Sequence, residues 1–345
     1  IADTLKVTEA VRLTLSGRYN RAHVDIRDRT GLTPALNGTH DFSRFNPAVG
    51  VTYNPAPRFT AYTGYNRGMR TPTPAELTCS DPGAPCRLPS VFLADPPLKP
   101  VLASTWELGM RGTVIEGVKA RLAVYRTDLQ DDIQFINTSR LANAGFFQNV
   151  GKTRRQGLEL GGEYRTGGVT FMASYAYIDA TYRSEFTQGS ANNSAAFDSD
   201  GNGTPDSIRV VRGNRIPGIP RQLLKLRGEY RPLERWMLGA DMIAASSQFA
   251  RGDENNADAA GAVPGYALVH FDVRYTLQPG WQLLMKVHNV FDRRYETFGV
   301  LGTNFFRGPG NTFDAAAAAP EQFRSSGAPR GAWVGVAYNY DQKKR

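Results

Sequence analysis

The sequence lacks long hydrophobic runs. Its mean hydropathy is −0.40, and no stretch approaches the roughly 18 to 20 apolar residues that a membrane-spanning helix needs. A helical membrane protein is therefore excluded. A transmembrane β-barrel is not excluded, because only every second residue of a barrel strand faces lipid.

Cysteine is nearly absent. The 345 residues include only Cys79 and Cys86, in the segment TCSDPGAPCR. Two cysteines this close in a Pro/Gly-rich segment predict a local disulfide and an oxidising compartment, with a pair of free thiols as the alternative. No further cysteine or nearby histidine completes the four ligands of a metal site.

Charge of one sign does not gather in any run. The 41 basic and 32 acidic residues give a net charge of +9. Their dispersal argues against a nucleic-acid partner and favours solvated faces, an anionic ligand or an anionic membrane surface. There is no nucleophile elbow, P-loop or metalloprotease motif, and the four histidines form no recognisable site. We expect no catalytic residues and no cofactor, apart from the calcium site considered below.

The chain has period-two alternation instead. In PGYALVHFDVRYT one face is apolar, and its residues are Ala267, Val269, Phe271, Val273 and Tyr275. Soluble sandwich strands alternate too. However, VTFMASYAYIDATYRSEF, which starts at Val169, far exceeds their usual five or six residues and suits a tilted strand that crosses a bilayer in about 9 to 11. The pattern predicts an all-β, antiparallel transmembrane barrel.

The connections alternate in length. Short ones lie near 9, 54–57, 114–117, 165–168, 231–235 and 278–280, and long ones near 28–40, 69–99, 130–145, 187–220, 250–264 and 298–330. Tight turns on one rim and long loops on the other are typical of outer-membrane barrels. Aromatic residues on the apolar strand faces mark the short-turn rim, where an interfacial girdle is expected: Tyr230, Tyr275 and Trp281.

Twelve connections imply about 13 strands. Bacterial single-chain barrels have an even number of strands, so we expect residues 1–345 to be part of a barrel whose N-terminal strands are missing. The first residues, IADTLKV, contain no start Met or apolar leader segment, which fits a removed signal or a start within a larger protein.

Four stretches, taken in order, resemble the C-terminal barrel of TonB-dependent outer-membrane receptors. They are FNPAVGVTYNPAPRFTAYTGYNRGMRTPTPAEL, NVGKTRRQGLELGGEYR, HNVFDRRY and GAPRGAWVGVAYNY. The resemblance implies roughly the last 13 strands of a 22-stranded, plugged barrel in the outer membrane of a Gram-negative bacterium. It also implies active uptake of a scarce nutrient, above all a ferric siderophore.

Two departures from the family pattern matter. Family members end on an aromatic residue, whereas here Tyr340 is followed by five polar residues. The family's plug domain and TonB box are not present, so the expected partner, the TonB complex, would act through a plug outside this chain. A receptor for cobalamin or another organic ligand, a passive porin and a surface adhesin remain alternatives.

Arginines toward the long loops are candidate ligand contacts. Guanidinium groups suit carboxylate, phosphate and catecholate-type anions, and the candidates are Arg67, Arg70, Arg154, Arg155 and Arg212. Loop solubility or contact with outer-membrane lipid and lipopolysaccharide is the alternative.

The segment DSDGNGTPD resembles part of an EF-hand loop. Its oxygen-bearing residues fall at loop positions 1, 3, 5 and 9, and they are Asp198, Asp200, Asn202 and Asp206. Position 12 is Arg209, so the bidentate Glu is absent. Weak calcium binding and a plain turn-rich acidic loop are both open.

Four motif residues have structural interpretations that we favour over ligand contact. Gly151 and Gly157 are expected to relieve crowding, and Asn289 and Asp292 to hydrogen-bond backbone at the outer end of a strand.

Overall fold

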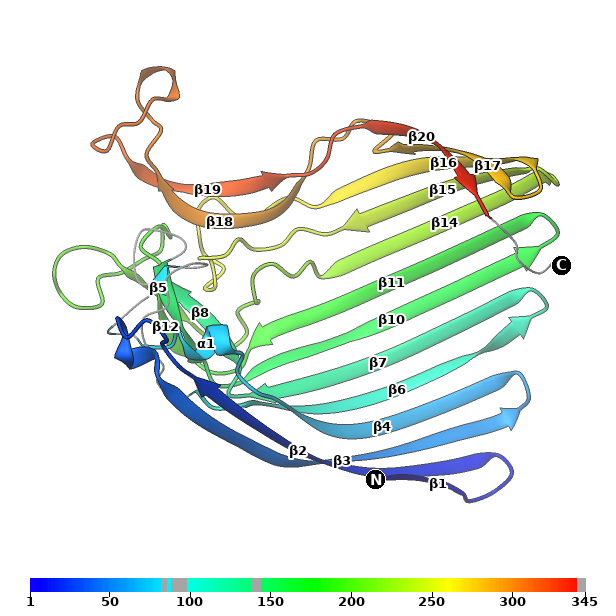
Figure 1. Ribbon diagram of the computed structural model, residues 1–345, viewed down its shortest axis with the longest axis horizontal. Coiled ribbons are helices and arrows are strands. Elements are labelled where there is room, and N and C mark those ends of the chain that lie inside the picture. The colour runs from blue at the N-terminus through cyan, green and yellow to red at the C-terminus, as the bar shows by residue number, and fades with distance from the viewer. Residues whose placement is uncertain (82, 84–85, 88–97, 138–143, 340–345) are drawn as a thin grey trace.

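The computed structural model describes residues 1–345 except 82, 84–85, 88–97, 138–143 and 340–345. Tyr340 and the five polar residues after it therefore lie outside the described residues. Thirteen antiparallel strands form one continuous curved sheet (Figure 1), as the connections predicted. In spatial order they are β1 (Ala2–Lys6), β2 (Val11–Ile26), β3 (Gly38–Ala56), β4 (Phe59–Arg70), β6 (Val101–Ile115), β7 (Val118–Gln130), β10 (Thr153–Thr166), β11 (Val169–Tyr182), β14 (Gln222–Leu233), β15 (Trp236–Ala245), β16 (Tyr266–Gln278), β17 (Trp281–His288) and β20 (Gly331–Tyr338). We call this sheet the wall; its closure with further strands into 22 stays a prediction.

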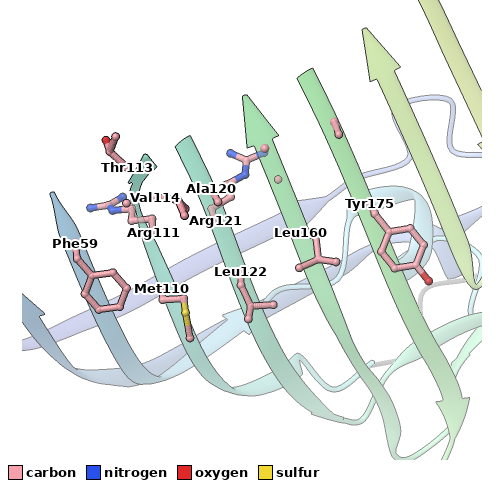
Figure 2. A pocket seen from close by; sticks show the side chains of 14 residues that line it. Phe59, Met110, Arg111, Thr113, Val114, Ala120, Arg121, Leu122, Leu160 and Tyr175 are labelled. Atoms are coloured by element: carbon pink, nitrogen blue, oxygen red, sulfur yellow. The ribbon is translucent and has the colours of Figure 1, made fainter. Parts of the chain in front are cut away.

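Each wall strand pairs with the wall strands before and after it in the chain. Because the strands are in register, the apolar residues of all of them lie on the same face of the sheet. One register row joins four bulky residues on four adjacent strands: Met110, Leu122, Leu160 and Tyr175. Figure 2 shows them side by side, with Phe59 of β4 beside them. The next row holds small residues, which border a hollow of about 700 Å³: Gly112, Ala120, Gly162 and Ala173. The wall thus has an apolar face, and its polar residues lie on the opposite face.

Short turns and long loops separate to opposite ends of the wall, as predicted (Figure 1). The long loops contain their own elements: η1 (Pro34–Leu36), α1 (Pro74–Leu77), β5 (Cys86–Arg87), β8 (Ile133–Asn137), β9 (Ala144–Asn149), β12 (Phe186–Gly189), β13 (Ser207–Val210), β18 (Glu296–Asn304), η2 (Pro309–Asn311) and β19 (Ala319–Ser326). They form three small sheets, β5-β9-β8, β12-β13 and β18-β19. Within the described residues, no helix is long and apolar enough to span a membrane.

The aromatic girdle near the short turns consists of paired rings. Trp236 lies 4.6 Å from Tyr275 and Trp281 lies 4.7 Å from Tyr338, measured between ring centroids. Each pair joins partners in register on neighbouring strands. The girdle residues therefore also pack against one another across neighbouring strands.

The structural roles expected of the four motif residues are confirmed. A Cβ at Gly157 would collide with the Tyr177 carbonyl oxygen, and Gly151 has a φ of +84°. The Asn289 side chain accepts from the Arg293 N–H and donates to the carbonyls of Arg293 and Ala328. Asp292 accepts from the Arg330 N–H. These bonds fix the chain where β17 ends.

Candidate functional site

The polar face of the wall carries a charge cluster centred on one arginine. Arg227 of β14 pairs with Glu229 at 3.1 Å, with Asp241 of β15 at 2.7 Å and with Asp272 of β16. Alternation places all four side chains on this face, and only 17 % of the Arg227 side chain is exposed. Three carboxylates around one guanidinium leave local negative charge, which Lys225 and Lys286 border in the same hollow of about 990 Å³.

Two histidines lie beside this cluster. His270 and His288, on neighbouring strands of the wall, have ring centroids 4.8 Å apart, and the Trp333 ring lies 4.8 Å from that of His288. His270 Nδ1 accepts from the Asn289 N–H at 2.9 Å. Both histidines therefore lie on the polar face of the wall. The polar face therefore presents both signs of charge and aromatic rings to whatever lies against it.

At the long-loop end, two candidate arginines are held by carboxylates. Arg70 pairs with Glu76 of α1 at 2.8 Å, and Thr73 and Glu76 form a capping box that orders this short helix. Burial opposes ionisation of Glu76, but hydrogen bonds from Arg70 and from the Thr73 N–H outweigh it and lower the pKa of Glu76. Arg155 lies 3.4 Å from Asp132, which also accepts from the Thr153 hydroxyl at 2.7 Å.

Three long loops are joined into one hydrogen-bonded unit, which we call the loop cluster. It comprises the segments near 186–216, 248–263 and 296–326. Asn193 Nδ2 donates to the Gly252 carbonyl at 3.0 Å, Asn256 Nδ2 to the Arg215 carbonyl at 3.0 Å, and Thr303 Oγ1 to Asn192 Oδ1 at 2.8 Å. Because buried polar groups must be hydrogen-bonded to avoid a desolvation cost, these bonds give the loops one defined arrangement.

Two adjacent acidic residues, Asp253 and Glu254, lie buried inside the loop cluster. Glu254 Oε1 accepts from the Gly252 N–H, whereas Glu254 Oε2 and Asp253 Oδ2 are buried and bond to no described residue. Burial raises the pKa of both carboxyls and lowers the pKa of Arg251. The Arg251 guanidinium carbon lies 4.7 Å from the ring centroid of Phe135 in β8, so the loop cluster also contacts the β5-β9-β8 sheet.

These loop residues were missed from the sequence. The segment RGDENNAD has turn-forming composition and no periodicity, and composition of that kind predicts a loop without telling which of its carboxyls are buried. Contacts with residues distant in the sequence, among them Asn193, Asn214 and Leu301, cover this segment.

The structure places the five predicted arginines in three different surroundings. Arg70 and Arg155 lie on the polar side, as described above. Arg67 lies on the same face of β4 as Tyr65, and Arg154 lies on the same face of β10 as Leu158 and Leu160. Both arginines are therefore on the apolar side of the wall. Arg212 is exposed in the turn after β13. Ligand contact by any of them stays a prediction.

The predicted calcium residues make local bonds. Asp198 accepts from the backbone N–H groups of Gly201, Asn202 and Gly203, and those bonds help to lower its pKa. Asp206 accepts from Ser199 N–H and Oγ. Among the residues that the structure describes, no group of three His, Cys, Asp or Glu side chains is placed to hold a metal ion. Calcium binding remains a prediction.

Cys79 is buried, with 1 % of its surface exposed, and is disulfide-bonded. The backbone of Cys86 pairs with Gly145 of β9, and the side chain of Cys86 lies outside the described residues.

Comparison with known proteins identifies what this geometry resembles. The family model described as "TonB dependent receptor-like, beta-barrel" matches residues 1–290. The metal-pseudopaline receptor CntO of Pseudomonas aeruginosa is 24 % identical over 86 % of this chain and 36 % of its own length. The ferric-pyoverdine M114 receptor PbuA of Pseudomonas sp. (strain M114) is 27 % identical over 77 % of this chain and 28 % of its own length. The crystal structure of the siderophore receptor PiuA from Acinetobacter baumannii superposes with a TM-score of 0.67 and 19 % identity, over 98 % of this chain and 42 % of that one. The chain thus spans about a third of the length of these two curated relatives.

Proposed function

Because the chain belongs to the TonB-dependent receptor-like β-barrel family, we propose that the protein carrying it is an outer-membrane receptor for active uptake of a ferric siderophore. The observation that supports this most is the agreement among relatives. The curated relatives CntO and PbuA are named for a metal-chelate or ferric-chelate ligand, and the fold matches that of a siderophore receptor. The 13-stranded wall supplies the barrel architecture that such a receptor requires.

The proposed mechanism uses the wall as a conduit and the long loops as the capture device. The long-loop end faces the exterior, where the loop cluster receives the chelate. A plug, expected from the family and not located on this chain, closes the lumen until the TonB complex acts on it. The polar face of the wall then offers the plug both signs of charge, around Arg227 and around Lys225 and Lys286. No covalent step is involved.

Among the candidate arginines, we propose Arg70 and Arg155 as contacts for an anionic chelate. Arg70 and Arg155 are on the polar side, where an entering ligand passes, and each keeps part of its guanidinium exposed beside its carboxylate partner. Arg67 and Arg154 lie on the apolar side, away from the path of an entering ligand. Arg154 and Arg212 are assigned a different role below.

A receptor for another chelate, such as a metal complex like that in the name of CntO or a cobalamin, is the second candidate. Uptake of radiolabelled ferric siderophores by cells that express the full receptor, with and without a functional TonB complex, tests the proposal. TonB-dependent iron accumulation supports it. Accumulation without TonB indicates a porin, and surface attachment without uptake indicates an adhesin.

A further inference from the structure

Four arginines gather at the long-loop end of the wall. We call them the outer arginine cluster: Arg126 of β7, Arg154 of β10, Arg183 directly after β11 and Arg212 in the turn after β13. β7 and β10 pair without a register shift, so side chains alternate regularly between the two faces of the wall. Arg126 therefore lies on the same, apolar face as Val124, and Arg154 on the same, apolar face as Leu158. The Gly213 N–H donates to the Tyr182 carbonyl at 2.9 Å, which brings the turn that holds Arg212 beside the end of β11.

The height of the cluster can be derived from the strand itself. Tyr164 lies two residues before the short-turn end of β10, and Arg154 lies ten residues before Tyr164 on the same face of that strand. At about 3.3 Å per residue this distance is roughly 33 Å along the strand. A barrel tilt of about 35–45° reduces it to a height of about 25 Å, which equals the height of the apolar band of an outer-membrane barrel. Arg154 therefore lies where the acyl chains of the outer leaflet end.

Aromatic neighbours mark the same level. Trp106 is opposite Arg126 in register and is 60 % exposed. The Tyr65 ring lies 4.5 Å from the Trp106 ring, and the Tyr65 hydroxyl accepts from Arg67 Nε at 2.7 Å. Exposed amphipathic rings at a barrel rim are typical of the headgroup region. Cations directly beyond them face lipid headgroups rather than the lumen.

The positive charge of the cluster is not balanced by the protein. Asp128 accepts from Arg126 Nε at 2.9 Å and from Arg154 Nε at 2.6 Å, and it is the single acid paired within the cluster in the described part of the chain. Four arginines and one aspartate leave a net charge of +3. Burial lowers the pKa of Arg183, and repulsion from Arg154, Arg212 and Arg126 adds to this effect. Arg183 Nε is buried and bonds to no described residue.

A neighbouring ion pair differs from the outer arginine cluster in its charge balance. Asp179 lies on the same side of β11 and pairs with Arg221 at 3.1 Å, so the charge of Arg221 is balanced within the protein. The outer arginine cluster spans β7, β10 and the end of β11 and carries an excess of three positive charges, so it instead requires anions from outside the protein. Guanidinium groups bind phosphate oxygens with two parallel N–H donors each, and phosphates at the top of the acyl layer are a property of lipopolysaccharide.

We propose that the outer arginine cluster binds the lipid A phosphates of lipopolysaccharide and that Trp106 and Tyr65 contact the adjoining acyl chains. This inference rests on the proposed outer-membrane location, but it is independent of the transported ligand. The site makes lipopolysaccharide a specific partner of this sector of the wall, between β4 and β11.

The test uses the full receptor purified from outer membranes and freed of bound lipid, with lipid A in detergent as the probe. Titration with lipid A and with enzymatically dephosphorylated lipid A compares the two on the unaltered protein. The double substitution Arg154→Gln, Arg183→Gln is expected to weaken lipid A binding about a hundredfold, since each lost charged contact counts for roughly a factor of ten. The matched control is Arg111→Gln, Arg121→Gln, which removes the same charge from paired positions on the polar face and leaves binding unchanged.

Equal affinity for the two lipid forms, or equal losses in the two double variants, overturns the proposal. If the Arg154 and Arg183 double variant fails to assemble, the phosphorylated and dephosphorylated probes still decide the question on the unaltered receptor. A receptor that binds lipid A but takes up no iron refutes the proposed ligand and leaves this inference intact. Absence of the receptor from outer-membrane fractions refutes both.

Discussion

The Arg251 guanidinium carbon lies 4.7 Å from the ring centroid of Phe135, and through this contact the loop between β15 and β16 reaches β8. Arg251 also accepts from the Leu301 N–H and donates its own N–H to the Gly299 carbonyl. Arg251 therefore joins its own loop to two other long loops.

Arg251→Gln is expected to loosen all three loops. A partly desolvated cation–π contact contributes about 0.5–2 kcal/mol, so the local opening constants should rise roughly 2- to 30-fold. Amide hydrogen exchange of segments 133–137, 250–258 and 299–303 measures this. Arg324→Gln, at an exposed site on β19, is the control. Faster exchange confined to residues next to 251 would contradict a joining role.

Glu254 is expected to make the loop cluster sensitive to pH. Burial raises the pKa of Glu254 and of Asp253, so both contribute stability that is present below the pKa of an unfolded carboxyl, about 4. That stability is lost as the pH rises through the raised folded values. Hydrogen exchange at 250–258, corrected for intrinsic base catalysis, should therefore accelerate from pH 4 toward neutrality. Each unit of pKa shift corresponds to about tenfold.

The variant Glu254→Gln carries a neutral side chain of the same shape. It should slow exchange at neutral pH and reduce the pH dependence, whereas Glu234→Gln in a short turn should change neither. A Glu254→Gln variant with an unaltered pH profile would remove Glu254 from this role.

Arg227 is expected to be the most sensitive charged residue of the wall. Arg227→Gln leaves Glu229, Asp241 and Asp272 facing one another without a cation. Because the site is partly exposed, the cost should be about 1–3 kcal/mol. Urea unfolding of the full receptor in detergent, followed by tryptophan fluorescence, measures it. Asp241→Asn, which leaves the other two pairs in place, should cost less; a larger loss there would contradict the central position of Arg227.

Gly157 and Gly162 offer a matched comparison within β10. A Cβ at Gly157 would collide with the backbone of Tyr177, whereas the nearest atom to a Cβ at Gly162 is 4.0 Å away. Gly157→Ala should destabilise the wall by about 1–3 kcal/mol, and Gly162→Ala should be nearly neutral. Heat-modifiability on gels and urea midpoints compare the two, and equal midpoints would refute a steric requirement at Gly157.

Calcium uptake by the acidic loop can be measured directly. The oxygen spacing of Asp198, Asp200, Asn202 and Asp206 predicts weak binding, in the millimolar range of extracellular sites. Calorimetric titration with millimolar Ca²⁺ should give heat that Asp200→Asn removes. Heat no different from buffer dilution would show that the loop is ordered by its own hydrogen bonds alone.

The wall could be predicted from the sequence because each of its strands obeys one local rule. Alternation and loop length together indicated 13 strands, and the same parity could have assigned the arginines. Arg154 is in phase with Leu158 and Leu160, whereas Arg155 is out of phase with them, and a step of one residue changes the face of the sheet. The prediction that Arg154 and Arg155 both contact the ligand did not take into account that they lie on opposite faces of the sheet.

The loop cluster could not be predicted in the same way. The burial of Asp253 and Glu254 depends on Asn193, Ser190 and Leu301, which are far from them in the sequence. Such pairings follow no period, and nothing in the composition of a loop determines which other loop it contacts.

The strictly sequential order of the wall strands has a kinetic consequence. Every pairing in the wall joins neighbours along the chain, so each hairpin closes at a small entropic cost. The Thr303–Asn192 bond of the loop cluster, by contrast, spans 111 residues. Contacts of such separation form slowly. The wall is thus expected to assemble hairpin by hairpin, and its mouth to acquire its final shape last.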